Sequence, residues 1–244
     1  MNLQEKRKFV LENLHCVPEE EKKLFDFNFA CVYTRNSVGM ESGKRASLEE
    51  VVSTVKGHNV KIDETLKRNV YNHYRAYEML LDHIAENGTK ELTEDFLKDL
   101  HTRLTKRILD NGGMYRNVNI TINGSMHTPC DYVKLYDRMK KYINDVNYNE
   151  KEDFEAIAYA HLQLAKLHPF LDGNGRLARL VLNYFLIKYG YAPVSIPAKR
   201  RLEYFDMLEE FKVNKNPVPF ENFIKELVEK EYDRMIEMIQ RYNK

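Results

Sequence analysis

Apolar residues recur at steps of three and four along most of the chain, and few prolines or glycines interrupt these runs. This spacing is typical of amphipathic helices, which turn one apolar stripe toward a core. We therefore expect an all-α fold. Helices are expected, with ends defined to about two to four residues, over residues 20–35, 47–56, 63–86, 93–109, 131–145, 151–167, 176–189, 200–212 and 219–242.

One segment alternates apolar and polar residues instead. Val118, Ile120 and Ile122 each have polar neighbours, and Asn123-Gly124 follows at once. Asn-Gly after such alternation predicts a small β-hairpin, because both central residues of its turn can take positive φ. A two-stranded ribbon is marginally stable alone. We therefore expect the hairpin to lean on the helices or to pair with an extended partner, and a plain connecting hairpin is the alternative.

The composition is that of an ordinary soluble protein, with 43% hydrophobic and 31% charged residues among 244. The net charge of +1 predicts no nucleic-acid partner. No apolar run approaches the roughly 20 residues of a membrane span, and no signal peptide is visible, so we expect no membrane partner. The three cysteines are distant and odd in number, which favours a reducing cytoplasm.

The segment from His168 to Arg179 reads His-Pro-Phe-Leu-Asp-Gly-Asn-Gly-Arg-Leu-Ala-Arg and separates two helical runs. Its proline and glycines enforce a loop. Gly-Asn-Gly lets backbone N–H groups approach a ligand, and the start of the following helix is a ready anion site. Gly173, Asn174 and Gly175 therefore predict a phosphate site.

The charged residues of this segment strengthen that interpretation. Arg176 and Arg179 lie side by side in the first helical turn, where cations are disfavoured unless an anion joins them, and guanidinium groups suit phosphate oxygens. Asp172 is a carboxylate of the kind that Mg²⁺ takes beside a polyphosphate. His168 can accept a proton from an attacking hydroxyl. Each residue alone has an ordinary structural role, but their order and spacing together predict phosphate chemistry.

These residues match the motif His-Pro-Phe-x-(Asp/Glu)-Gly-Asn-Gly-Arg-x-x-Arg of the Fic (filamentation induced by cAMP) family at every specified position. By this resemblance the fold is a Fic-type helical bundle with one small hairpin. Residues 1–92 would be an N-terminal helical extension, 93–212 the Fic core, and 213–244 a C-terminal helix packed on the core.

The resemblance implies a Mg²⁺-dependent protein adenylyltransferase that moves AMP from ATP to a Tyr, Thr or Ser hydroxyl of a protein, itself included. His168 would deprotonate the attacking hydroxyl, and Asp172 would hold Mg²⁺. The residues implied to bind ATP are Gly173, Asn174, Gly175, Arg176, Arg179 and, on the adenine side, Tyr204. The hairpin resembles the family's flap, on which a target would dock by strand addition; it comprises Ile122, Asn123, Gly124, Ser125 and Met126.

A second resemblance lies near the N-terminus. Ser37-Val-Gly-Met-Glu41-Ser42 is similar to the family's inhibitory pattern (Ser/Thr)-x-x-x-Glu-(Gly/Asn), except at its last position. The resemblance implies that Glu41 pairs with Arg179 and excludes the ATP γ-phosphate, since carboxylate and phosphate compete for one guanidinium. Residues 37–42 are thus a candidate inhibitory segment, with a polar turn between helices as the alternative. Ser42 leaves the strength of inhibition open.

Three other functions stay open at this point. The same fold could remove AMP or transfer another phosphate-containing group. The chain could be a toxin component or a partner-controlled regulator, although its own inhibitory segment argues against a separate antitoxin. It could also be a non-catalytic nucleotide-binding module, against which the retained His168 argues. Motifs of P-loop, kinase and H-E-x-x-H type are absent from the sequence. The sequence leaves open which protein is the target and whether the chain forms a homodimer.

Overall fold

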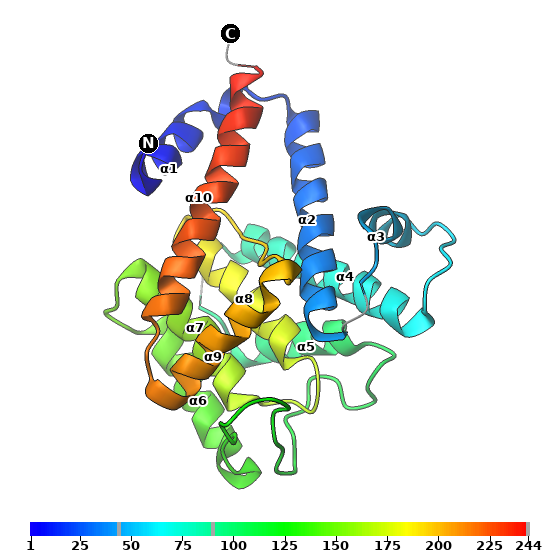
Figure 1. The fold of residues 1–244 in the computed structure, drawn as a ribbon, viewed down its shortest axis with the longest axis vertical. Coiled ribbons are helices and arrows are strands. Elements are labelled where there is room, and N and C mark those ends of the chain that lie inside the picture. Colours follow the sequence, from blue (N-terminus) through cyan, green and yellow to red (C-terminus); the bar gives the residue numbers. More distant parts are fainter. Residues whose placement is uncertain (43–44, 89–90, 243–244) are drawn as a thin grey trace.

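The computed structural model describes residues 1–42, 45–88 and 91–242, and it is built from helices and loops (Figure 1). The α-helices are α1 (Leu3–Asn13), α2 (Glu19–Ser42), α3 (Leu48–Val55), α4 (Glu64–Asn87), α5 (Glu94–Thr105), α6 (Leu135–Asn147), α7 (Asp153–Leu167), α8 (Asn174–Lys188), α9 (Arg201–Asn214) and α10 (Val218–Gln240). Short 3₁₀ turns occur at Leu14–Cys16, Tyr132–Lys134 and Ala198–Arg200. No strand occurs among the described residues, so the all-α class is confirmed.

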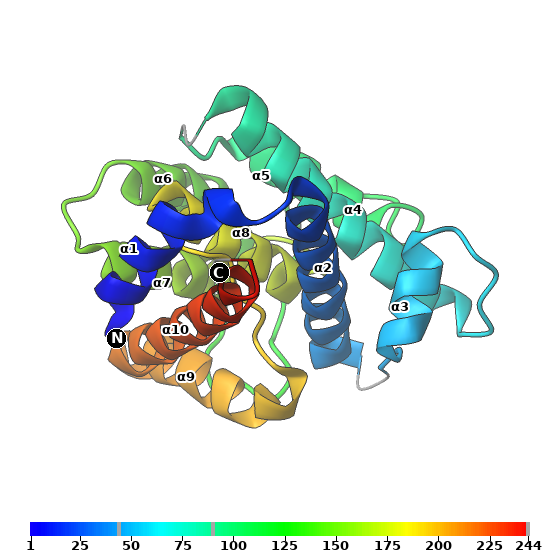
Figure 2. The same cartoon turned by 90° about the horizontal axis from the view of Figure 1, so that it is seen from above.

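Helices α7 and α8 form the centre of the fold, and their buried sides explain this position. Almost every residue of α8 as far as Leu186 is buried, which is typical of a helix surrounded by others. α4, α5 and the end of α2 pack on α8, while α6, α9 and α10 pack on α7. Figure 2 shows the two central helices enclosed in this way. The loop that joins α7 to α8 is therefore held between two rigid helices.

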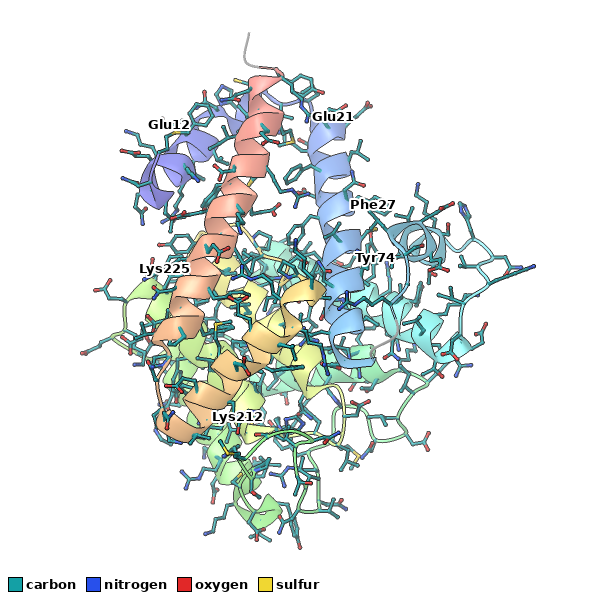
Figure 3. All side chains as sticks on the ribbon, in the orientation of Figure 1. Glu12, Glu21, Phe27, Tyr74, Lys212 and Lys225 are labelled. Atoms are coloured by element: carbon teal, nitrogen blue, oxygen red, sulfur yellow. The ribbon has the colours of Figure 1, made fainter. Side chains whose placement is uncertain are left out.

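Two long helices, α2 and α10, rise from this centre (Figure 1). α10 packs against α1, α7 and α9, and α2 packs against α4. The α2–α4 contact includes an edge-on pair of rings, Phe27 and Tyr74, with centroids 6.3 Å apart (Figure 3). Because α2 lies along α4 and also reaches α8, its last turn is placed beside the loop between α7 and α8. No helix in the described part of the chain has the length and apolarity to cross a membrane.

The sequence-based expectation differs from the structure at two helices. α1 (Leu3–Asn13) was not expected, because only Val10 of it is fully buried and no apolar stripe marks it. α2 continues to Ser42 rather than ending near residue 35. The candidate inhibitory segment 37–42 is consequently helical and not a turn between helices. The other expected helices are present, with ends shifted by up to four residues.

The expected hairpin forms only as its turn. Residues 117–126 are loop, and Gly124 takes the expected positive φ of 76°. The Ser125 N–H donates to the Ile122 carbonyl at 3.1 Å, which closes the turn. The expected strands are absent from this described segment, so that part of the expectation is corrected.

Side chains bind two backbone groups of this segment. The Val118 carbonyl accepts a hydrogen bond from the Arg116 guanidinium at 3.0 Å. The Met126 N–H donates to the Glu209 carboxylate at 2.6 Å. These two backbone groups are satisfied by side chains, and the two arms of the turn form no strand pair in this described segment.

Candidate active site

The loop between α7 and α8 is bounded by two residues in the left-handed backbone region. His168 ends α7 with φ 49° and ψ 61°, and Gly173 precedes α8 with φ 78°. Glycine adopts this conformation without strain, whereas for a non-glycine residue it is unfavourable and is common at functional sites. The His168 carbonyl accepts a hydrogen bond from the buried Arg116 at 3.0 Å. The structure around it thus holds His168 in a strained conformation.

Asn174 locks the loop with its side-chain amide. Its Oδ1 accepts from the Phe170 N–H at 2.9 Å and its Nδ2 donates to the Phe170 carbonyl at 2.8 Å. The side chain is buried and faces the loop itself. A phosphate would therefore meet the backbone N–H groups in the first turn of α8, which has no side-chain cap.

His101 on α5 supports the same loop and was missed by the sequence analysis. Its Nδ1 accepts from the Gly113 N–H at 2.9 Å, so Nε2 carries the proton and donates to the Asp172 carbonyl at 2.9 Å. Its ring stacks on Phe170 with centroids 3.7 Å apart. Burial lowers the pKa of His101 to about 4, which keeps the ring neutral. The only available signal was a histidine on the apolar face of the helix expected over residues 93–109.

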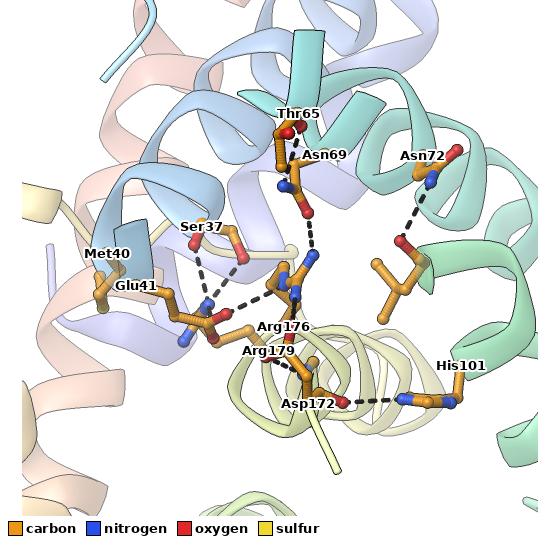
Figure 4. A network of polar contacts seen from close by, with 12 residues as sticks. Ser37, Met40, Glu41, Thr65, Asn69, Asn72, His101, Asp172, Arg176 and Arg179 are labelled. Carbon is orange, nitrogen blue, oxygen red and sulfur yellow. Dashed lines mark hydrogen bonds and ion pairs between the residues drawn. The ribbon is translucent and has the colours of Figure 1, made fainter. Parts of the chain in front are cut away.

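Arg179 is the deepest charged group of the site, with 1% of the residue exposed. Its Nε donates to Ser37 Oγ and its Nη2 to the Ser37 carbonyl, both at 2.8 Å. Nη2 also contacts Glu41 Oε1 at 2.9 Å (Figure 4). The remaining nitrogen, Nη1, is buried and has no hydrogen-bond partner among the described residues. A buried donor without a partner is unfavourable, so this atom indicates a place for an incoming acceptor.

Arg176 completes the cationic pair. Its Nε donates to Glu41 Oε2 at 3.0 Å and its Nη2 to Asp172 Oδ2 at 3.2 Å, while Nη1 contacts Asn69 on α4. Glu41 therefore bridges both arginines (Figure 4). A Cβ added to Gly175 would collide with Glu41 Oε1. The carboxylate thus occupies the space over the backbone where the sequence predicts phosphate.

The electrostatic balance at Glu41 favours its charged form. Burial would raise the pKa of this carboxyl, but the charges and hydrogen bonds of Arg179 and Arg176 outweigh burial and lower the pKa below its ordinary value. The side chain is 28% exposed, against 2% for that of Arg179. Glu41 is therefore an ionised group at the mouth of the site, paired with deeper cations.

His168 stands at the rim of the same loop. Burial lowers its pKa to about 4, so the imidazole is neutral at pH 7. Its Nδ1 lies 3.4 Å from the Ala165 carbonyl; a proton on Nδ1 would leave Nε2 free to accept one. The geometry permits the predicted general base.

Asp172 fits a magnesium ion bound chiefly through a nucleotide. Its side chain is 57% exposed, and Oδ1 accepts from the Gly173 N–H at 2.7 Å. In the described ranges, no cluster of three or more His, Cys, Asp or Glu side chains could hold a metal by itself. One accessible carboxylate beside a phosphate site matches the way Mg²⁺ is commonly held, with phosphates and water completing its shell.

The other predicted site residues lie around this centre. Tyr204 is fully buried; its hydroxyl lies 3.0 Å from His161 Nε2 and its ring centroid 5.9 Å from the Arg179 guanidinium. Its ring has no exposed face, so contact with adenine stays a prediction that this geometry does not favour. Met126 in the predicted flap is 82% exposed. The side chain of Ser42 lies outside the described part of the structure.

Comparison with known proteins matches residues 91–186 to the family model described as Fic/DOC family. Over 146 residues the chain is 33% identical to "Protein adenylyltransferase Fic" of Drosophila persimilis. The aligned residues cover 59% of this chain and 28% of that protein. The chain thus spans about a quarter of the length of this curated relative.

Solved structures show the same fold. A Fic-domain signalling protein from Bacteroides thetaiotaomicron superimposes with a TM-score of 0.85 at 20% identity, covering 98% of this chain and 95% of that one. IbpAFic2 covalently tethered to Cdc42 has a TM-score of 0.53 at 18% identity, covering 93% and 87% of the two chains. These likenesses establish the architecture around the loop between α7 and α8.

Proposed function

Because the chain carries a Fic domain over residues 91–186, we propose that it is a protein adenylyltransferase that moves AMP from ATP to a Tyr, Thr or Ser hydroxyl. One observation carries this proposal: a single loop brings together a neutral histidine, an accessible carboxylate and two arginines at an uncapped helix start. The name of the Drosophila relative supports it. The proposed targets include the protein itself. The three free thiols, Cys16, Cys31 and Cys130, agree with a cytoplasmic location, where thiols stay reduced.

The proposed reaction follows from the positions of these groups. The target hydroxyl loses its proton to His168 Nε2, and its oxygen bonds to the α-phosphorus of ATP. The bond from that phosphorus to the bridging oxygen breaks, and pyrophosphate leaves. Arg176, Arg179 and the first-turn N–H groups of α8 bind the phosphates and stabilise the charge that develops. Asp172 would hold Mg²⁺, which supplies further neutralisation of the phosphate oxygens when bound.

We propose further that the free protein is autoinhibited. The Glu41 carboxylate accepts hydrogen bonds from both arginines, at 2.9 and 3.0 Å, and so competes with phosphate oxygens for the same donors. Ser37 keeps the Arg179 guanidinium in place through two further bonds. ATP would bind productively once Glu41 has left.

The test is transfer of label from α-³²P-ATP with Mg²⁺ to the protein itself and to proteins of a cell lysate. We expect weak labelling by the wild type, at least tenfold more by Glu41→Gly, and none by Glu41→Gly combined with His168→Ala. Calorimetry with ATP verifies that the double variant still binds nucleotide. If no variant labels anything although all bind ATP, AMP transfer is wrong, and AMP removal or plain nucleotide binding replaces it.

A further inference from the structure

An open pocket of about 420 Å³ lies away from the catalytic loop, between α3, α4 and the end of α5, on the side of the molecule where α3 projects (Figure 1). Its volume is in the range of small-molecule sites. None of the residues 168–179 lines it. The basic residues that line it are Lys67, Arg68, Arg103, Lys106 and Arg107.

The charge of this pocket is unbalanced. One carboxylate lines it, Glu64, and it lies 4.0 Å from Lys67. Within the described part of the chain, the other four cations make no ion pair with a carboxylate. The whole chain carries a net charge of +1, so this excess is a local feature. A concave surface lined by one sign of charge attracts ions of the opposite sign.

The backbone at the rim is strained and fixed. Arg107 has φ 60°, the left-handed region that a bulky residue rarely adopts. The Asn72 side chain holds the turn by donating to the Lys106 carbonyl at 2.8 Å, and Arg68 donates to the Arg107 carbonyl at 3.2 Å. Glycine would fit this backbone better. Strain of this kind is a reason to look for a function of the side chain.

An aromatic ring adds a flat surface to the same pocket. Tyr71 lines it and is 41% exposed. The Arg103 guanidinium lies 5.7 Å from the ring centroid, which orients one cation without neutralising it. Neighbouring polar residues of α4 contact the two sites separately. Figure 4 shows Asn69 directed to Arg176 at the catalytic loop, whereas Asn72 is directed to the backbone at the end of α5, beside the pocket.

We propose that this pocket binds a small, multiply phosphorylated molecule of nucleotide size, at a site separate from the catalytic one. The four cations without a carboxylate partner supply donors for phosphate oxygens, and the part-exposed ring of Tyr71 accommodates a planar or apolar portion. The volume of the pocket suits a small ligand rather than the long track that a nucleic acid requires. This inference does not depend on AMP transfer.

The test is calorimetric titration with inorganic tripolyphosphate at low and at physiological salt. Arg107→Gly removes a cation and suits the backbone, so we expect the thermal midpoint to stay or rise while tripolyphosphate binding weakens roughly tenfold, as the loss of a charged hydrogen-bond donor predicts. Lys215→Gly is the matched control, because Lys215 is an exposed cation with φ 63° outside the pocket. That variant should bind as the wild type does.

Two further variants distinguish this pocket from the catalytic anion site. Arg176→Ala disables the catalytic anion site and should leave tripolyphosphate binding in place, whereas Arg103→Gln should weaken it. The proposal is overturned if Arg107→Gly and Arg103→Gln bind like Lys215→Gly, or if Arg176→Ala alone abolishes binding. Equal binding of a polyglutamate peptide would also refute it, since the pocket would then recognise negative charge and not phosphate.

Discussion

At the scale of single residues, the Glu41 carboxylate and a phosphate group would compete for the same buried guanidinium donors. Arg179 has three nitrogens, and Ser37 and Glu41 occupy two of them while Nη1 is left without a partner among the described residues. Removing Glu41 would leave two arginine side chains, 6% and 2% exposed, without their shared anion. We therefore expect Glu41, the residue proposed to inhibit, to stabilise the fold as well.

We expect Glu41→Gly to lower the free energy of unfolding by about 2–3 kcal/mol, less than for a fully buried pair because Glu41 is partly exposed. ATP should restore more stability to this variant than to the wild type, since phosphates can replace the lost carboxylate. Thermal unfolding with and without ATP and Mg²⁺ measures both effects. Equal nucleotide-induced shifts in the two proteins would contradict the competition.

The lowered pKa of Glu41 also predicts a pH dependence of stability. A carboxyl with a depressed folded-state pKa stabilises the protein fully above its unfolded pKa, and this contribution is lost as pH falls through the folded pKa. The stability difference between wild type and Glu41→Gln should thus be constant from about pH 7 to 5 and shrink below about pH 4. Urea unfolding at several pH values measures it. The charge of Glu41 raises the pKa of His168, so both proteins are compared in a His168→Ala background; a difference that grows on acidification there would refute the ion pair.

At the scale of elements, two helices carry charges at the ends where their own dipoles disfavour them. Glu41 lies in the last turn of α2, and Arg176 and Arg179 lie in the first two turns of α8. An acid at a helix C-terminus and cations at an N-terminus are each unfavourable by some tenths of a kcal/mol. Here the carboxylate and the two guanidinium groups pair and neutralise each other. A phosphate group would also neutralise the cations at the start of α8.

The loop expected as a flap is fixed to α9 through one carboxylate. Glu209 accepts from the Ser125 hydroxyl and from the Met126 N–H, each at 2.6 Å. We expect Glu209→Ala to speed amide hydrogen exchange at residues 122–127 by about tenfold, corresponding to roughly 1.4 kcal/mol of lost restraint. Glu210→Ala is the matched control, because among the described residues the Glu210 carboxylate accepts its hydrogen bonds from Asn214 and Asn216 near the end of α9. Identical exchange in the two variants would show that Glu209 does not restrain the loop.

At the scale of the whole molecule, helical periodicity was enough to predict the class and most elements. It failed for the end of α2, whose buried face carries Thr34 and Ser37 as well as Met40, so polar residues interrupt the apolar pattern. It failed for the hairpin because Asn-Gly predicts only the turn. The conformation of the flanking residues depends on contacts with the rest of the molecule, such as the hydrogen bond from Met126 to Glu209 on α9.

The candidate site was likewise predictable only in part. The loop 168–179 was predictable because its residues are contiguous and their spacing has chemical meaning. The supports of that loop come from other helices: His101 from α5 and Asn69 from α4. No local pattern connects them to the loop, and only the packing of these helices on α8 brings them there. The basic pocket likewise combines α4 with the end of α5.

Under the proposed inhibition, the position of Glu41 in the last turn of a 24-residue helix would make basal activity a measure of helix fraying. Met40 is completely buried beside it, so unwinding or shifting the end of α2, which would carry the carboxylate away from the arginines, costs free energy. Under the proposed inhibition, the working enzyme is the small population with this end open, and each 1.4 kcal/mol of opening free energy reduces that population about tenfold. Heat, a mild denaturant or a partner that captures the frayed turn would then raise turnover before the protein unfolds.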